Sequence, residues 1–181
     1  QKNDKTWTVH TEKGDINCQY VVNAAGYYAQ QVGEWFKPYG GRTVPMMVMS
    51  HQYLLSEEIP EIENYAKKSG KKLPLLRDVD ISYYLRQEKN GFNLGPYEPN
   101  CKAHWATEDD PMPDDFSFQL WNDDLDRIED IVADAMERVP LLGTSGVSRV
   151  INGPIPYAPD GLPLIGPMPG VENGFEACVF T

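Results

Sequence analysis

Apolar and polar residues alternate along the first part of the chain. They do so over residues 6–11, after which a Lys-Gly-Asp turn leads into residues 16–22. Two such runs around a glycine turn are typical of a β-hairpin. The second run ends in Val-Asn-Ala-Ala-Gly, and residues 27–36 then have helical character. The pattern predicts a hairpin followed by a strand–turn–helix.

The middle of the chain contains the strongest hairpin signal. Residues 82–86 and 91–95 read as strands joined by a Lys-Asn-Gly turn, and Asn-Gly favours such turns because both residues tolerate positive φ. One further strand is predicted at residues 45–55. Residues 56–72 read as a polar connection.

One long helix is predicted over residues 120–139, where apolar residues recur at spacings of three and four. Its start carries two aspartates that suit the helix dipole, and Pro140 ends it. The preceding stretch, residues 99–118, is rich in prolines and acids and predicts a long loop.

The last third of the chain is dense in proline and glycine. Residues 150–166 read VINGPIPYAPDGLPLIG, which excludes a regular element and predicts a rigid turn around Asp160. The turn delivers a short strand at residues 162–166. A second strand follows at residues 175–180, after a Glu-Asn-Gly turn.

Composition limits the range of functions. The chain has 181 residues, of which 41% are hydrophobic, so it can bury a core. A net charge of −11 argues against nucleic acid or an anionic membrane surface as partner.

Three widely spaced cysteines argue against a disulfide framework or structural zinc, and we expect no metal. No apolar run approaches the roughly 18 residues of a membrane span. Because the chain begins with Gln1 and stops in a predicted strand, we expect it to be a piece of a longer protein.

Two segments could bind a small molecule. The Ala-Ala-Gly corner before residues 27–36 would let backbone approach a ligand at a helix N-terminus, although many α/β proteins share such a corner. The hairpin around residues 82–95 carries two adjacent tyrosines and a Gly-Pro-Tyr-Glu corner. These aromatic residues could line a pocket, or they could simply pack in the core.

Several motifs in fixed order resemble one enzyme family. They read VVNAAG, HQYLL, LRD, SYYLRQE, GPYE, DLDRI, AMERVP and NGPI.Y.PD.LP.IGP..GV.N. Across essentially the whole chain they are similar to the FAD-dependent amine oxidoreductases related to D-amino-acid oxidase and sarcosine dehydrogenase, and most of all to those acting on dimethylglycine. The resemblance implies oxidation of an N-methyl group by hydride transfer to FAD, yielding sarcosine from dimethylglycine.

The resemblance also implies a fold. We expect an α/β structure with α+β character, in which residues 1–42 are part of an FAD-binding domain. Residues 43–150 would form a substrate-binding antiparallel sheet domain with one long helix, and residues 151–181 would return to the FAD-binding domain.

Site residues follow from the positions that match the family's motifs. His51 and Tyr84 match its active-site histidine–tyrosine pair, although a lone histidine on an apolar strand is otherwise more often a core residue. An amine must be neutral to release hydride, so a nearby base that takes its proton is useful. Tyr83 is the obvious alternative to Tyr84, since neighbouring strand residues face opposite sides.

Further positions match parts of the family's ligand sites. Gly95 and Tyr97 match a corner near the substrate, with a simple turn as the alternative. The residues that match FAD contacts are Ala25, Gly26, Tyr28, Phe180 and Thr181. Thr181 departs from the family, which has glycine there.

Other features implied by the resemblance lie outside these residues. The G-x-G-x-x-G fingerprint and the covalent FAD attachment would precede the chain, and a tetrahydrofolate-binding region would follow it, so we expect the chain alone to be inactive. Electrons would pass to electron-transfer flavoprotein or oxygen. The cysteine usage suits a mitochondrial matrix or a bacterial cytoplasm.

Two alternatives to a dimethylglycine enzyme remain. One is an enzyme similar to sarcosine dehydrogenase. The other is a non-catalytic relative, because a pyruvate dehydrogenase phosphatase regulatory subunit shares the fold. Retention of His51 and Tyr84 favours an enzyme, since a regulator needs no proton relay.

Overall fold

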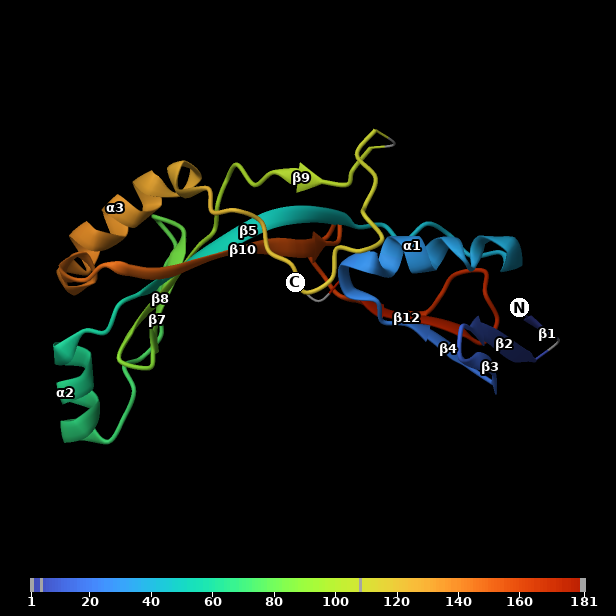
Figure 1. Cartoon of the computed structure of the whole chain (residues 1–181), viewed down its shortest axis with the longest axis horizontal. Coiled ribbons are helices and arrows are strands. Elements are labelled where there is room, and N and C mark those ends of the chain that lie inside the picture. The colour runs from blue at the N-terminus through green and yellow to red at the C-terminus, as the bar shows by residue number, and fades with distance from the viewer. Residues whose placement is uncertain (1, 4, 108, 180–181) are drawn as a thin grey trace. The chain divides into compact units, whose positions relative to one another are not determined.

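The computed structural model describes residues 2–3, 5–107 and 109–179. These residues form two compact units (Figure 1). Unit 1 comprises residues 1–49, 103–112 and 155–181, and unit 2 comprises residues 50–102 and 113–154. The mixture of helices and mainly antiparallel sheets confirms the predicted α/β fold with α+β character.

Unit 1 contains two three-stranded sheets and a short helix. One sheet has the antiparallel order β1-β2-β3, and the other has the order β11-β12-β4, with β4 parallel to β12. The bounds are β1 Lys2–Asn3, β2 Thr6–Thr11, β3 Gly14–Cys18, β4 Val21–Asn23, β11 Leu164–Pro167, β12 Gly174–Cys178 and helix α1 Ala29–Glu34, with 3-10 helices Gly26–Tyr28 and Lys37–Tyr39.

The strand predicted at residues 16–22 is wrong in one respect. It is two strands, β3 and β4, which pair in different sheets. The alternation that continues through residues 19 and 20 conceals this break, because an apolar pattern does not record which strand each part pairs with.

Unit 2 is built on a larger antiparallel sheet with the order β10-β5-β8-β7-β6. The short strand β9 pairs with the first part of β5, which belongs to unit 1. The bounds are β5 Met47–Ser56, β6 Leu76–Asp78, β7 Tyr83–Glu88, β8 Gly91–Pro96, β9 Ala103–His104, β10 Val147–Tyr157, α2 Pro60–Ser69 and α3 Glu129–Arg138, with 3-10 helices Leu125–Arg127 and Pro140–Thr144.

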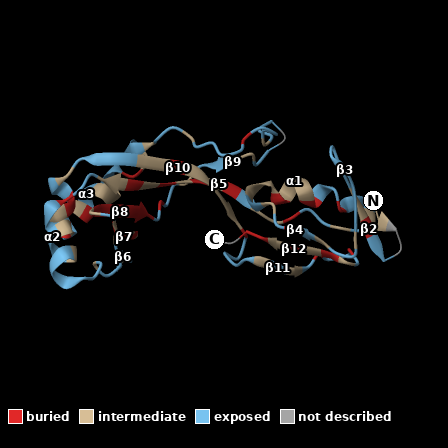
Figure 2. Ribbon diagram, turned by 60° about the horizontal axis from the view of Figure 1, so that its bottom comes forward, coloured by how far each residue is buried: buried red, intermediate tan, exposed pale blue. Residues whose placement is uncertain are grey.

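One face of this sheet packs against helices α2 and α3. Figure 1 places both helices at the end of unit 2 where β7 and β8 lie. Ile62 of α2 and Ala135 of α3 join Leu85 and Leu94 of the sheet in one buried cluster. All six residues of β8 are buried, as the red ribbon in Figure 2 shows. This helix-covered face is the core of unit 2.

The predicted hairpin is confirmed, but its turn differs in detail. Tyr84 pairs with Gly95 and Glu88 pairs with Gly91, so Lys89 and Asn90 form a two-residue turn. The residue with positive φ is Lys89, at 52°, while Gly91 belongs to β8. A side chain at Gly91 would collide with the backbone around Ser56, which explains the glycine there.

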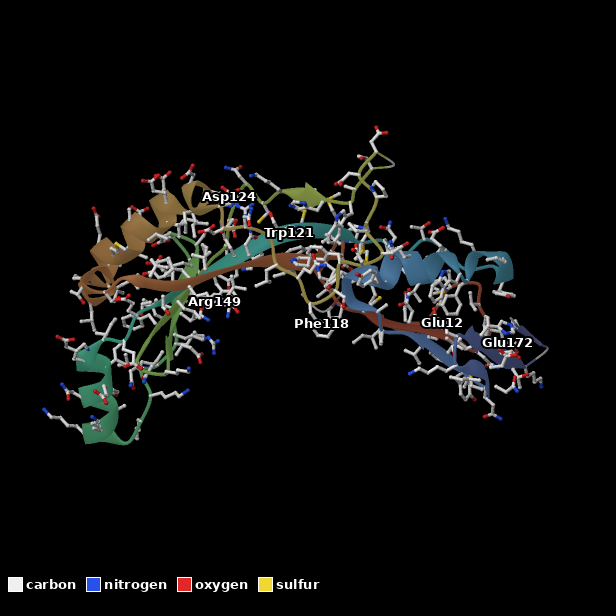
Figure 3. The ribbon with its side chains drawn as sticks, viewed as in Figure 1. Glu12, Phe118, Trp121, Asp124, Arg149 and Glu172 are labelled. Carbon is white, nitrogen blue, oxygen red and sulfur yellow. The ribbon has the colours of Figure 1, made fainter. Side chains whose placement is uncertain are left out.

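Two helix predictions need correction. The segment read as a polar connection contains α2, which begins at Pro60 and ends before Gly70 in the left-handed conformation. Proline at the first turn and glycine just past the last are the usual helix punctuation. The long helix is shorter than predicted: α3 begins only at Glu129, residues 125–127 form a separate 3-10 helix, and residues 120–124 are not helical. Trp121, which Figure 3 labels, instead forms an isolated bridge with Asn152.

The proline-rich segment also differs from its prediction. Strand β10 continues through Pro154 and Pro156 to Tyr157. Strand β10 is an edge strand of its sheet. A proline there removes no interstrand hydrogen bond when its nitrogen faces away from the neighbouring strand. The predicted turn around Asp160 does lead into β11. Among the described residues, no helix combines the length and apolarity that a membrane crossing requires.

Candidate functional site

The two adjacent tyrosines of β7 face opposite sides of the sheet. Tyr83 is 0% exposed and belongs to the buried cluster under the helices. Tyr84 lies on the other face, here called the open face, and is partly buried. Its ring lies directly against Gly95, because a Cβ atom at that position would overlap the ring carbons and the hydroxyl oxygen. The structure thus brings together two residues that the sequence predicted as site residues.

Tyr97 and Arg77 extend this cluster at the edge of the sheet. The rings of Tyr84 and Tyr97 meet edge to face, with centroids 5.9 Å apart. The Arg77 guanidinium lies 5.2 Å from the Tyr97 ring centroid, and its Nη2 donates a hydrogen bond to the Tyr97 hydroxyl. Tyr97 is 42% exposed, so this part of the cluster is open to solvent.

Tyr84 retains its proton at neutral pH. Burial raises the pKa of its phenol above the ordinary value, and the nearby Tyr97 and Tyr53 hydroxyls raise it further, against the opposing charge of Arg86. A neutral phenol is both a hydrogen-bond donor and an acceptor. Tyr84 can therefore orient a polar ligand on the open face.

His51 lies on β5, on the same side of the sheet as Tyr84. Along β5 the buried positions alternate with less buried ones, and His51 and Tyr53 share the second set. Leu54 pairs with Leu94, which pairs with Leu85, so these leucines mark the core face of β5, β8 and β7. His51 and Tyr84 thus occupy positions of the open-face parity, on strands separated by β8.

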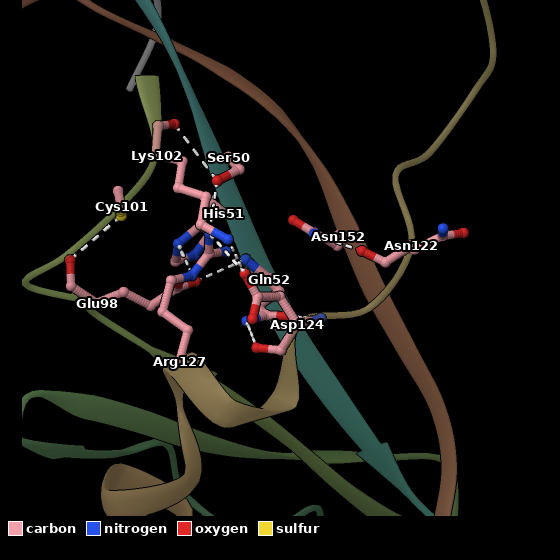
Figure 4. Close-up of polar contacts among 10 residues, drawn as sticks. All are labelled: Ser50, His51, Gln52, Glu98, Cys101, Lys102, Asn122, Asp124, Arg127 and Asn152. Carbon is pink, nitrogen blue, oxygen red and sulfur yellow. Dashed lines mark hydrogen bonds and ion pairs between the residues drawn. The ribbon is translucent and has the colours of Figure 1, made fainter. Parts of the chain in front are cut away.

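The His51 imidazole faces a buried carboxylate. Its Nδ1 lies 3.4 Å from Oε1 of Glu98, and the side chains are 13% and 0% exposed, respectively. Figure 4 shows both residues with their neighbours. The same Oε1 accepts a hydrogen bond of 2.8 Å from the backbone N–H of Gln52.

Arg127 supplies the opposite charge. Its Nε forms an ion pair with Oε2 of Glu98, and its side chain is only 7% exposed. Burial alone would raise the pKa of Glu98. The hydrogen bonds from His51 and Gln52, together with the Arg127 charge, outweigh burial and hold that pKa below its ordinary value. Glu98 is therefore ionised at neutral pH.

Cys101 completes a set of three potential metal ligands with His51 and Glu98. Their donor atoms lie within 4.8 Å of one another. However, Glu98 is already paired with Arg127, whose charge would repel a cation. The pKa of the Cys101 thiol is raised by burial and by Glu98, which disfavours the thiolate that binds metals. The set is better suited to hydrogen bonding.

Three of the predicted cofactor residues, Ala25, Gly26 and Tyr28, lie in unit 1 at the corner between β4 and α1. Gly26 has φ of 59°, and a Cβ atom there would meet nothing within 4 Å. The corner is held by buried Asn23, whose side chain bonds to the Ala29 carbonyl at 2.8 Å and accepts from the Ala25 N–H at 3.3 Å. This open corner lets a ligand approach the backbone closely, as a bound dinucleotide requires.

Aromatic side chains gather beside this corner. The rings of Tyr27 and Tyr28 are 4.9 Å apart, and Tyr27 is 6.2 Å from Trp105. Trp105 also lines a pocket of about 310 Å³ with Gln30 and Met46. Flat aromatic surfaces next to an open backbone fit an FAD group. The predicted contacts Phe180 and Thr181 lie outside the described residues.

Sequence reasoning missed four polar residues of the site, namely Tyr53, Arg77, Glu98 and Arg127. Glu98 ends the Gly-Pro-Tyr-Glu run and is buried. Its burial could not be predicted, because it depends on the position of β5 beside it. The sequence around Arg127 does not indicate its role, because its partner Glu98 is 29 residues away in the sequence.

The chain is similar to known FAD-dependent enzymes. Residues 1–180 match the model of the family described as FAD dependent oxidoreductase. Mitochondrial dimethylglycine dehydrogenase from Mus musculus is 41% identical over 98% of the chain and 20% of its own length. Mitochondrial sarcosine dehydrogenase from the same organism is 34% identical over 96% of the chain and 17% of its length.

Solved structures agree on the fold. L-proline dehydrogenase from P. horikoshii superposes with a TM-score of 0.66 at 20% identity, over 96% of this chain and 40% of its own. The chain spans about a fifth of the length of the curated relatives it matches. Since the family match covers nearly every residue, the chain belongs to the FAD-dependent oxidoreductase family.

Proposed function

We propose that this chain is part of an FAD-dependent enzyme that oxidatively demethylates dimethylglycine to sarcosine, with His51 and Tyr84 at the substrate. The observation that carries the proposal is the placement of the predicted pair. Tyr84 lies on Gly95, is kept neutral by burial, and occupies the same face as His51. The greater identity to dimethylglycine dehydrogenase than to sarcosine dehydrogenase supports the substrate.

The residues of the chain would prepare the amine. A tertiary ammonium cannot release hydride, so His51 accepts the ammonium proton and Tyr84 orients the neutral amine through its hydroxyl. FAD, when bound, supplies the acceptor for the hydride that leaves an N-methyl carbon. The substrate is left as an iminium ion, whose one-carbon unit passes to water or to tetrahydrofolate.

Cofactor and partners extend the same proposal. Ala25, Gly26 and Tyr28 would contact FAD within unit 1, and Gly95 and Tyr97 would border the substrate on the open face. The covalent FAD attachment and the tetrahydrofolate region would lie outside this chain. Electrons would leave through electron-transfer flavoprotein or oxygen, in a mitochondrial matrix or a bacterial cytoplasm.

The test uses the full-length protein that contains this chain. Its flavin spectrum is recorded, and dimethylglycine, sarcosine and betaine are added separately without oxygen. We expect dimethylglycine to bleach the flavin band fastest, and Tyr84→Phe and His51→Ala to slow the bleaching. Faster bleaching by sarcosine would favour the sarcosine dehydrogenase-like alternative. A protein without flavin would favour the regulatory alternative.

A further inference from the structure

We infer that Glu98 is a positioning residue for His51: the buried carboxylate fixes the imidazole with its proton on Nδ1, which leaves Nε2 free to accept the substrate's proton. The inference rests on the proposed function, because it assigns the residue through which His51 would act as a base. Figure 4 shows Glu98 between His51 and Arg127.

The carboxylate itself is held by contacts to both oxygens. Oε1 accepts the Gln52 backbone N–H at 2.8 Å and faces His51 Nδ1 at 3.4 Å. Oε2 contacts Arg127. The β5–β8 ladder pairs Leu54 and Leu55, so Gln52 lies beyond it, and Glu98 provides the acceptor for the Gln52 N–H.

Arg127 is fixed in its turn. Its Nη1 donates a hydrogen bond of 2.7 Å to the Ser50 hydroxyl and lies 3.7 Å from Asp124 Oδ2. Asp124 is tied to β5, because its backbone N–H donates to the Gln52 side chain, which donates back to the Asp124 carbonyl. The guanidinium therefore cannot swing away without breaking several buried contacts, and Glu98 keeps a cation beside it.

The charges around Glu98 keep its carboxylate ionised, so it accepts hydrogen bonds and does not hold a proton itself. Arg127 favours the ionised carboxylate, so the proton between Glu98 and His51 stays on the imidazole. The other charged neighbours are Asp124 and Lys102, which pair with each other, while Cys101 donates its thiol hydrogen to the Glu98 carbonyl at 3.2 Å. A carboxylate on one ring nitrogen sets the tautomer of the other.

A second consequence concerns the protonated state of His51. Once His51 has taken a proton from the substrate, the imidazolium faces an ionised carboxylate across 3.4 Å. Opposite charges at that distance attract, so the carboxylate also holds the ring in place after the transfer. Glu98 would thus raise the rate through His51 without touching the substrate.

The test is a double-mutant cycle on flavin reduction by dimethylglycine in the full-length protein. We expect Glu98→Gln to slow the reduction at least about tenfold at neutral pH, since a misplaced general base forfeits much of its usual contribution. In a His51→Asn background the same change should slow it less than about twofold, because residues that act through one another are not additive. Full slowing in both backgrounds would overturn the inference.

Saturation kinetics separate positioning from a merely structural effect. Glu98→Gln should lower the limiting rate of flavin reduction while leaving the dimethylglycine concentration at half-saturation unchanged, because the carboxylate does not touch the substrate. A rise in that concentration without a fall in the limiting rate would contradict the inference. If His51→Asn itself leaves the reduction rate unchanged, the proposed role of His51 fails first.

A lone Arg127 charge could prevent Glu98→Gln from folding, since an unpaired buried charge is costly. The combined Glu98→Gln and Arg127→Met variant removes both charges and serves as the second test, with the same expected fall in the limiting rate of flavin reduction. Glu176→Gln is the matched control: Glu176 is also buried and pairs with Arg42 at 2.8 Å, in unit 1. It should leave the limiting rate of flavin reduction unchanged.

Discussion

The ring of Tyr84 covers Gly95, its partner on the neighbouring strand, so closely that position 95 has no room for a Cβ atom. The glycine therefore allows the phenol to lie flat on the open face of the sheet. The same packing sets where its hydroxyl can be presented to a ligand.

We predict that Gly95→Ala displaces the Tyr84 ring. The forced overlap should lower the free energy of unfolding by about 1–3 kcal/mol, as overpacking usually does. It should also slow flavin reduction in the full-length protein. Gly143→Ala is the control, because a Cβ atom there meets Met136 at an ordinary 3.7 Å. Equal effects of the two changes on the reduction rate would contradict the importance of the Tyr84 position.

The two tyrosines of β7 should respond differently to loss of the hydroxyl. The Tyr83 hydroxyl is buried without a hydrogen-bond partner among the described residues. Tyr83→Phe should therefore leave the free energy of unfolding unchanged or raise it by about 1 kcal/mol, with normal flavin reduction. Tyr84→Phe should preserve stability and slow the reduction. Thermal unfolding and rapid-mixing spectroscopy of both variants would check this, and the reverse pattern would show that Tyr83 faces the substrate.

Glu98 predicts a dependence of stability on acid. Its pKa is below the ordinary value of 4.5 in the folded protein, so its ionised form stabilises the fold above that pH. This contribution should be lost as the pH falls through the lowered folded pKa. The combined Glu98→Gln and Arg127→Met variant should show a smaller loss of melting temperature below about pH 4.5 than the unmodified protein. Identical acid dependence would mean that Glu98 is not ionised in the fold.

Lys89 pays a conformational cost in the hairpin turn, since its φ is 52°. Left-handed backbone costs a residue with a side chain about 1–2 kcal/mol, and glycine avoids that cost while gaining entropy in the unfolded chain. Lys89→Gly should raise the free energy of unfolding by up to about 1 kcal/mol. Lys13→Gly, in a turn without positive φ at that residue, should lower it. Denaturant titrations of both variants would decide.

Much of the fold could be predicted from sequence patterns, and the failures have physical causes. The β7–β8 hairpin was predictable because its turn and its alternation are both local. The break between β3 and β4 was not, since alternation continues through it. Helix α2 was overlooked because only Ile62 is buried in it, which leaves a weak apolar pattern.

The site divides in the same way. The pairing of Tyr84 with Gly95 follows from hairpin register, and the position of His51 on the Tyr84 side follows from strand alternation. The contact between Glu98 and Arg127 depends on how a loop after β8 meets the segment before α3. Such contacts are set by tertiary packing, which no short pattern in the sequence records.

Oxidation of an N-methyl group by FAD can be followed in the full-length protein by rapid mixing with dimethylglycine that carries either ordinary or deuterated N-methyl groups. We expect dimethylglycine to bleach the flavin, deuteration to slow the bleaching severalfold, and His51→Asn and Tyr84→Phe each to slow it as well. Two results would rule out the proposed reaction: bound flavin that dimethylglycine fails to bleach, or bleaching in both variants at the rate of the unmodified protein.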